Sequence, residues 1–149
     1  MNKISINIFL LFNIIFLFTK CDLDDNKLLV RNKSTKNIYC EVSLDTITSI
    51  KYFDYMSKIP KMKLHPNDSI RPLFARKGEG WENKINRYSV DSNLHIFFFV
   101  VDTVEKYGWD KILQKRMYER KDFKVKQLES MHWCYDYFPT WSKETLVNQ

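Results

Sequence analysis

The sequence predicts an α+β fold: a small, mainly antiparallel β-sheet or sandwich with short peripheral helices, after an N-terminal signal peptide. Three observations support this class. Several short runs are apolar or alternate between apolar and polar residues, as strands do. Other short stretches carry apolar residues three and four positions apart, as amphipathic helices do. The order of these runs lacks the regular strand–helix alternation of a parallel sheet.

The first expected element is a hairpin. Leu28–Arg31 has β-type composition, and Asn37–Ser43 alternates apolar and polar residues. The polar stretch 32–36 between them has turn composition, so we expect these two strands to pair. A further short strand is expected near Ser69–Phe74, where Pro72 indicates the edge of a sheet.

The strongest element is Leu94–Val101, which has one histidine among seven apolar residues. We expect it to be a central strand that is buried on both faces. Trp81–Tyr88 precedes it and has the spacing of a short amphipathic helix. Asp102 follows it and is expected to cap a helix, with Glu105 placed three residues later as in a capping box.

The C-terminal third alternates short helices and strands. Gly108 is expected to end the first helix, and Trp109–Arg116 to continue as a second helical piece. Met117–Asp122 is expected to be extended, and Val125–Met131 to be a short helix. His132–Phe138 is expected to be the final strand.

Size and motifs exclude several functional classes. The chain of 149 residues fits one domain and is too short for a barrel enzyme or a doubly wound dehydrogenase. It contains no CxxC, HExxH, GxSxG, phosphate-binding loop or dinucleotide fingerprint. We therefore expect no catalytic residue, no metal site and no cofactor. The histidines His65, His95 and His132 are expected to be structural.

Residues 1–20 have the pattern of an export signal. Lys3 precedes an uncharged segment, residues 4–18, in which only three residues are not apolar. Its fifteen residues match the apolar region of a signal peptide and fall short of the ~20 residues of a spanning helix. A buried core helix is the alternative, although a helix that is apolar on every face suits a small domain poorly.

Cys21 directly follows this segment, and Asp22, Asp24 and Asp25 follow the cysteine. The arrangement resembles the lipobox of bacterial lipoproteins, in which the cysteine is lipidated and becomes the mature N-terminus. The acidic residues resemble the export address of surface-exposed lipoproteins of the Bacteroidetes. Lys20 departs from the small residue usual before the cysteine, so an ordinary cysteine near a conventional signal stays the alternative. Residues 21–27 would form an acidic tether.

Two C-terminal regions extend this likeness. The segment Asn93–Ile112 joins an apolar strand to an Asp-Thr-x-Glu-x-x-Gly-Trp-Asp pattern, and Tyr118–Phe123, Leu128–Trp133 and Tyr137–Pro139 follow it. Both regions resemble small Bacteroidetes lipoproteins of uncharacterised function. The resemblance implies an exported protein with a single domain, and it implies no catalytic residue. From the pattern of residues we expect this domain over residues 28–139, with 140–149 as a flexible tail.

The other two cysteines, Cys40 and Cys134, are expected to be free thiols. The strand phases place Cys40 inward and Cys134 outward, and an inward and an outward sulfur on one sheet do not meet.

Two groups of residues are candidates for binding. Trp141, beyond the last strand, is the tryptophan expected to be exposed, whereas Trp81, Trp109 and Trp133 are expected to pack in the core. A run of basic residues is a possible patch for an anionic glycan or lipid headgroup, or simply a solvated face. Its candidate binding residues are Lys115, Arg116, Arg120 and Lys121.

Three functional hypotheses follow. The first is a non-enzymatic cell-envelope lipoprotein, anchored through Cys21 in the outer membrane or at the cell surface. It would act as an interaction or accessory module, with an envelope protein or glycan as partner. The second is a soluble secreted or periplasmic ligand-binding protein, and the third is a small hydrolase. Export argues against nucleic acid as a partner.

Overall fold

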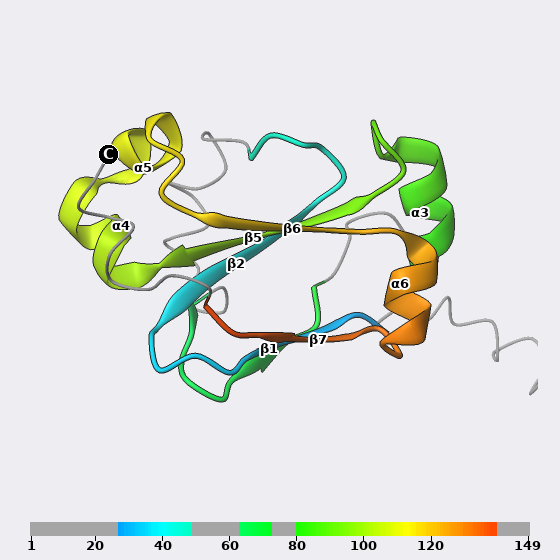
Figure 1. The fold of residues 1–149 in the computed structure, drawn as a ribbon, viewed down its shortest axis with the longest axis horizontal. Coiled ribbons are helices and arrows are strands. Elements are labelled where there is room, and N and C mark those ends of the chain that lie inside the picture. Colours follow the sequence, from blue (N-terminus) through cyan, green and yellow to red (C-terminus); the bar gives the residue numbers. More distant parts are fainter. Residues whose placement is uncertain (1–26, 49–62, 73–79, 140–149) are drawn as a thin grey trace, which may run out of the picture.

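The computed structural model describes residues 27–48, 63–72 and 80–139 (Figure 1). These residues form two small sheets with short helices at both ends, so the predicted α+β class is confirmed. The strands are β1 (Leu29–Asn32), β2 (Ile38–Ser43), β3 (Lys63–Leu64), β4 (Ser69–Ile70), β5 (Leu94–Val100), β6 (Glu119–Phe123) and β7 (Cys134–Tyr137). The helices are α3 (Trp81–Tyr88), α4 (Val101–Tyr107), α5 (Trp109–Gln114) and α6 (Val125–Ser130).

The two sheets differ in strand order and direction. One has the order β4-β1-β7, and the other has the order β3-β2-β5-β6. Every described pairing is antiparallel except that of β1 with β7. β5 lies inside the larger sheet and is buried along almost its whole length, as predicted.

The main core lies between the two sheets. Alternate residues of β5, among them Ile96 and Phe98, face Val30 of β1 and Tyr137 of β7 across this space. Phe98 and Tyr137 stack with ring centroids 4.0 Å apart and an interplanar angle of 14°. Aromatic pairs of this kind stabilise a core beyond the area they bury, by about 1 kcal/mol.

A second core lies on the opposite face of the larger sheet. Phe97 and Phe99 of β5 pack there against Val104 of α4 and Ile112 of α5. Because side chains alternate along a strand, β5 supplies apolar residues to both cores. This double burial explains its continuous apolar sequence.

Helices α3 and α6 close one end of the main core (Figure 1). Trp81 and Ile85 of α3 and Leu128 of α6 are buried in it. The chain enters the domain beside them, because Lys27 forms an ion pair with Glu82 in the first turn of α3. The Lys27 ammonium also lies 4.0 Å from the ring centroid of Trp133, just after α6.

The predicted hairpin of Leu28–Arg31 with Asn37–Ser43 is wrong. β1 and β2 belong to different sheets, and β1 pairs in parallel with β7. Asn32 lies where the chain crosses between the sheets, and its buried side chain fixes this crossing. Its amide donates to the carbonyls of Lys36 and Leu64, at 2.8 and 3.1 Å.

The predicted cap at Asp102 is also wrong. Helix α4 begins at Val101, directly after β5, and the residue before it makes no side-chain capping bond. Asp102 lies in the first turn of α4, where a carboxylate is favourable near the positive end of the helix. Its Oδ2 forms an ion pair with Nζ of Lys36 at 3.4 Å. Gly108 separates α4 from α5 as expected, with a φ of +72°.

Cys40 and Cys134 are free thiols, as predicted, but for a different reason. They do not lie on one sheet: Cys40 is in β2 of the larger sheet and Cys134 is in β7 of the smaller one. Cys40 is buried in the main core, whereas Cys134 is partly exposed.

Candidate functional site

Several of the predicted site residues lie outside the described residues. These are the lipid-attachment candidate, the acidic residues after it and the C-terminal tryptophan: Cys21, Asp22, Asp24, Asp25 and Trp141. The signal peptide and the tail also lie there. The other tryptophans behave largely as predicted, because Trp81 and Trp133 are buried and Trp109 packs against Tyr39 and Phe99.

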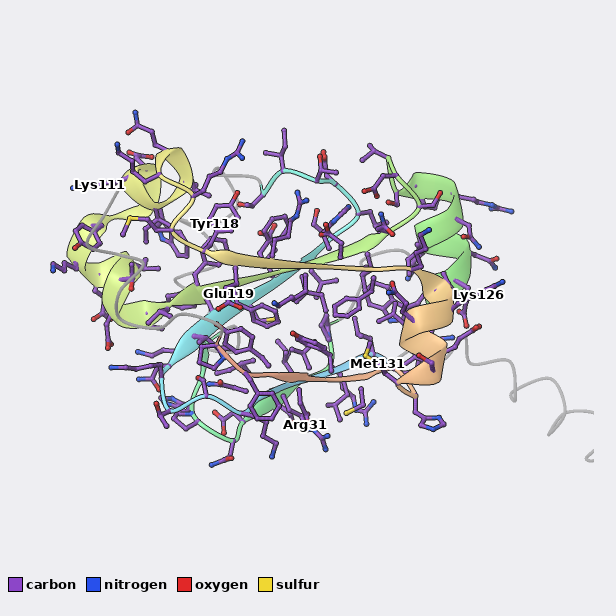
Figure 2. All side chains as sticks on the ribbon, viewed as in Figure 1. Arg31, Lys111, Tyr118, Glu119, Lys126 and Met131 are labelled. Atoms are coloured by element: carbon purple, nitrogen blue, oxygen red, sulfur yellow. The ribbon has the colours of Figure 1, made fainter. Side chains whose placement is uncertain are left out.

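The predicted basic patch is divided by the fold. Lys115 and Arg116 are exposed in the turn after α5. Arg120 and Lys121 are neighbours on β6, so their side chains point to opposite faces of the sheet. The Lys121 side chain lies on the face of the sheet that is turned toward the main core, and its Nζ is 3.8 Å from Oε2 of Glu119 on the same face. Figure 2 shows the same alternation one step earlier, with Tyr118 and Glu119 on opposite sides of β6.

Arg120 instead belongs to a polar cluster centred on His95. This cluster lies on the opposite face of the larger sheet, the face that carries the second core. The His95 side chain is completely buried. Its Nδ1 lies 2.8 Å from Oδ1 of Asp122, which is its partner in the β5–β6 register. Its Nε2 lies 3.1 Å from Oδ1 of Asp91, in the turn between α3 and β5. Only the doubly protonated ring donates to both carboxylates at once.

The same cluster holds two loops in place. Arg120 forms a two-pronged pair with Asp122, at 3.0 Å for both contacts, and donates to the carbonyl of Thr46 at 3.0 Å. The backbone amide of Val90 donates to the carbonyl of Leu44 at 3.4 Å. The loop after β2 and the turn after α3 are therefore linked to each other and, through His95, to the sheet.

We call residues 44–48 and 88–93, together with Arg120 and Asp122, the apical surface. It carries three of the large apolar side chains that are exposed among the described residues: Ile47 at 73%, Val90 at 69% and Tyr88 at 43%. Exposed apolar side chains that gather on neighbouring loops mark interaction sites more often than isolated ones do. A fixed backbone beneath them lowers the entropy cost of binding.

The apical surface also carries carboxylates. Hydrogen bonds from Asn93 and Ser89 and the charge of His95 lower the pKa of Asp91 to about 2, so it stays ionised. Asp45 is exposed and accepts a hydrogen bond from the Ile47 amide. Asp122 is paired with Arg120 and Asp91 with His95, so cations balance these two carboxylates, and Asp45 adds one further negative charge to this surface.

Glu41 lies deeper on the same face of the sheet. Burial raises its pKa to about 7, because the desolvated carboxylate is penalised, and the Thr48 hydroxyl only partly offsets this. One carboxyl oxygen of Glu41 is buried and accepts no hydrogen bond from the described residues. Glu41 is therefore partly protonated at neutral pH.

The cluster is arranged for positioning and not for proton transfer. Both ring nitrogens of His95 are engaged by carboxylates, so neither is placed to act on a substrate. Burial raises the pKa of the Cys40 thiol, which keeps it protonated and unreactive. Among the described residues, no group of three or more histidine, cysteine or carboxylate side chains is arranged to hold a metal ion.

The apical surface was not predicted from the sequence, although one signal was available. A buried histidine in an otherwise apolar strand needs polar partners for its ring nitrogens, and Asp91 lies only four residues before His95. The second partner, Asp122, depends on the strand register. Ile47 and Val90 stand alone in polar loops and give no local pattern.

Comparison of the chain with protein-family models, with curated proteins and with solved structures gave no match. Within the described ranges, none of the helices has the length and hydropathy needed to cross a membrane.

Proposed function

We propose that this chain is a non-enzymatic cell-envelope lipoprotein, held through Cys21 in the outer membrane or at the cell surface, and that its domain acts as an interaction or accessory module. The observation that carries the proposal is the cysteine at the end of an uncharged apolar segment of signal-peptide length. A lipid on that cysteine confines the domain to a surface and raises its effective concentration there.

The geometry of the domain supports a role in binding. Residues 22–26 separate Cys21 from Lys27, so the tether reaches at most about 20 Å. Lys27 contacts the first turn of α3, whereas the apical surface begins at the last residue of that helix. In Figure 1 the turn after α3 lies on the side of the larger sheet away from β1 and β7. The tether and the apical surface would therefore lie at opposite ends of α3, which leaves the apical surface accessible to partners.

A protein suits the apical surface better than a glycan does. Sugar rings stack on flat aromatic faces, but the most exposed apolar side chains here are Ile47 and Val90. Trp81 and Trp133 are buried in the main core and cannot form a sugar platform. The buried core of a protein interface is apolar and poor in charged residues, so exposed aliphatic side chains on a fixed backbone suit a protein partner.

The test is the intact mass of the protein extracted from the cell envelope, measured beside a Cys21→Ala variant. We expect a mature chain that begins at Cys21 and carries acyl groups, and we expect the variant to lack this added mass. An unmodified cysteine, or cleavage at another position, would contradict the anchor. The protein would then be a soluble secreted or periplasmic one.

A further inference from the structure

We propose that His95 is a pH-sensitive switch in the fold. With both ring nitrogens protonated, it holds the turn between α3 and β5, residues 89–93, against the larger sheet, and the loss of one ring proton releases this turn. The switch would set how ordered the apical surface is. It goes beyond the interaction role proposed above and does not depend on whether Cys21 is lipidated.

The switch depends on three elements that meet at one ring. The His95 side chain is completely buried on β5, and its Nδ1 and Nε2 lie 2.8 and 3.1 Å from carboxylate oxygens of Asp122 and Asp91. Asp122 belongs to β6, whereas Asp91 belongs to the turn after α3. A neutral imidazole carries one N–H, so it donates to only one of these carboxylates at a time.

The charges around the ring balance only while it carries both protons. Asp91 contacts it from the turn and Asp122 from β6, and Arg120 of β6 pairs with Asp122. The protonated ring and Arg120 together match the two carboxylates. Loss of a ring proton leaves one negative charge in excess around a side chain that water does not reach, where electrostatic repulsion is strong. The other charged groups on the neighbouring segments are Glu41 of β2 and, both exposed, Asp45 in the loop after β2 and Arg87 in the last turn of α3.

The contact with Asp91 is the one that should break. Asp122 is the partner of His95 in the β5–β6 ladder and cannot move away without disrupting that ladder. The remaining proton therefore stays on Nδ1, which makes the shorter contact, and the lone pair of Nε2 then faces the Asp91 carboxylate. The turn can respond, because the bond from the Val90 amide to the Leu44 carbonyl is long, at 3.4 Å, and holds it only weakly.

The turn should move as a unit. The Ser89 hydroxyl and the Asn93 amide both donate to Asp91 at 3.1 Å, and these bonds do not involve the ring. Hydrogen bonds from Asn93 and Ser89 also lower the pKa of Asp91 to about 2, so its carboxylate stays ionised in both states of the switch. Release would therefore loosen the attachment of the turn and leave its internal bonds in place. A contact at the apical surface would then cost more entropy at high pH than at low pH.

The test uses the full chain, isolated from the envelope in a neutral detergent and labelled with ¹³C and ¹⁵N. Ring ¹⁵N shifts show how many protons His95 carries, and ¹³Cα relaxation gives the order parameters of residues 89–93 without the use of amide protons. We expect a doubly protonated ring with order parameters of about 0.85 at pH 5, and a singly protonated ring with values that fall toward about 0.6 at pH 9. An unchanged ring, or a turn that is equally ordered at both pH values, would overturn the proposal.

Two substitutions isolate the cause. Glu41 lies on the same face of the sheet as His95, and burial raises its pKa to about 7, so the measurements are made in a Glu41→Gln background. In this background, Asp91→Asn should keep the turn ordered at both pH values, because an amide can accept from a protonated ring nitrogen or donate to an unprotonated one. Asp110→Asn, at an exposed position of α5, is the matched control and should lose order at pH 9 as its parent does.

Circular dichroism at both pH values checks that each variant stays folded. If the turn of Asp91→Asn loses order at pH 9 as the control does, repulsion at Asp91 is not the cause and the proposal fails. A turn that is mobile at both pH values in Asp91→Asn would also contradict it, since the amide can pair with either form of the ring. The relaxation measurement needs no acyl group and the mass measurement needs no ordered turn, so the two proposals fail independently.

Discussion

At the scale of single residues, Glu41 is a carboxyl group whose environment opposes its charge. Its pKa is about 7 in the folded protein, against an ordinary value of 4.5. Between these values the folded state binds a proton that the unfolded state has already lost. The free energy of unfolding should therefore fall as pH rises from about 4.5 to 7, and stay at the lower level above that window.

Glu41→Gln should remove this penalty. We expect the variant to be more stable than the parent by about 1–3 kcal/mol at pH 8, and nearly unchanged at pH 4. Urea denaturation at both pH values measures the difference. Glu105→Gln, at an exposed position of α4, is the control and should be neutral at both. A gain from Glu41→Gln that is equal at both pH values would contradict the assigned cause.

At the scale of elements, the crossing between β1 and β2 depends on the Asn32 side chain. Its amide donates to three backbone carbonyls, those of Lys36, Leu64 and His65, and its oxygen accepts from Ser34. These bonds join the start of the crossing to the β3–β4 segment. No apolar side chain of similar size can replace them.

Asn32→Leu should remove all of these bonds at a fully buried position, and it should leave the Ser34 amide without its acceptor. We expect the free energy of unfolding to fall by about 2–4 kcal/mol, because buried polar groups that lose their partners are costly. Asn86→Leu, on the exposed side of α3, is the matched control and should change stability by less than about 0.5 kcal/mol. Chemical denaturation of the three proteins measures both values, and similar losses in the two variants would contradict the role of Asn32.

The elements that the sequence predicts well are those whose signal is local. The helix at Trp81–Tyr88 and the strand at Leu94–Val100 follow from the spacing of apolar residues, which is set within one element. The partner of a strand is not a local property. Leu29–Asn32 would fit a hairpin with the next strand equally well, but β7 joins it from more than 100 residues away. The apical surface was missed for the same reason, since loops distant in sequence form it.

At the scale of the whole molecule, β5 links two cores that are otherwise separate. Phe98 faces the main core between the sheets, whereas Phe97 and Phe99 face the core beneath α4 and α5. Neither core can lose its packing without exposing one face of the same strand. The two cores should therefore unfold together.

Tryptophan residues report on both cores. Trp81 and Trp133 are buried in the main core, and Trp109 packs against Phe99 in the other. In protein labelled with 5-fluorotryptophan, we expect the ¹⁹F signals of all three to lose native intensity at the same urea concentration. Assignment uses single Trp→Phe variants.

Phe99→Ala extends this test. Deleting a buried phenylalanine costs about 3–5 kcal/mol, and a shared strand should spread that loss to both cores. We therefore expect the midpoints of the Trp81 and Trp109 signals to shift to lower urea by the same amount. An earlier transition for Trp109 alone would show instead that α4 and α5 detach as an independent unit, and that the apical surface and the main core persist without them.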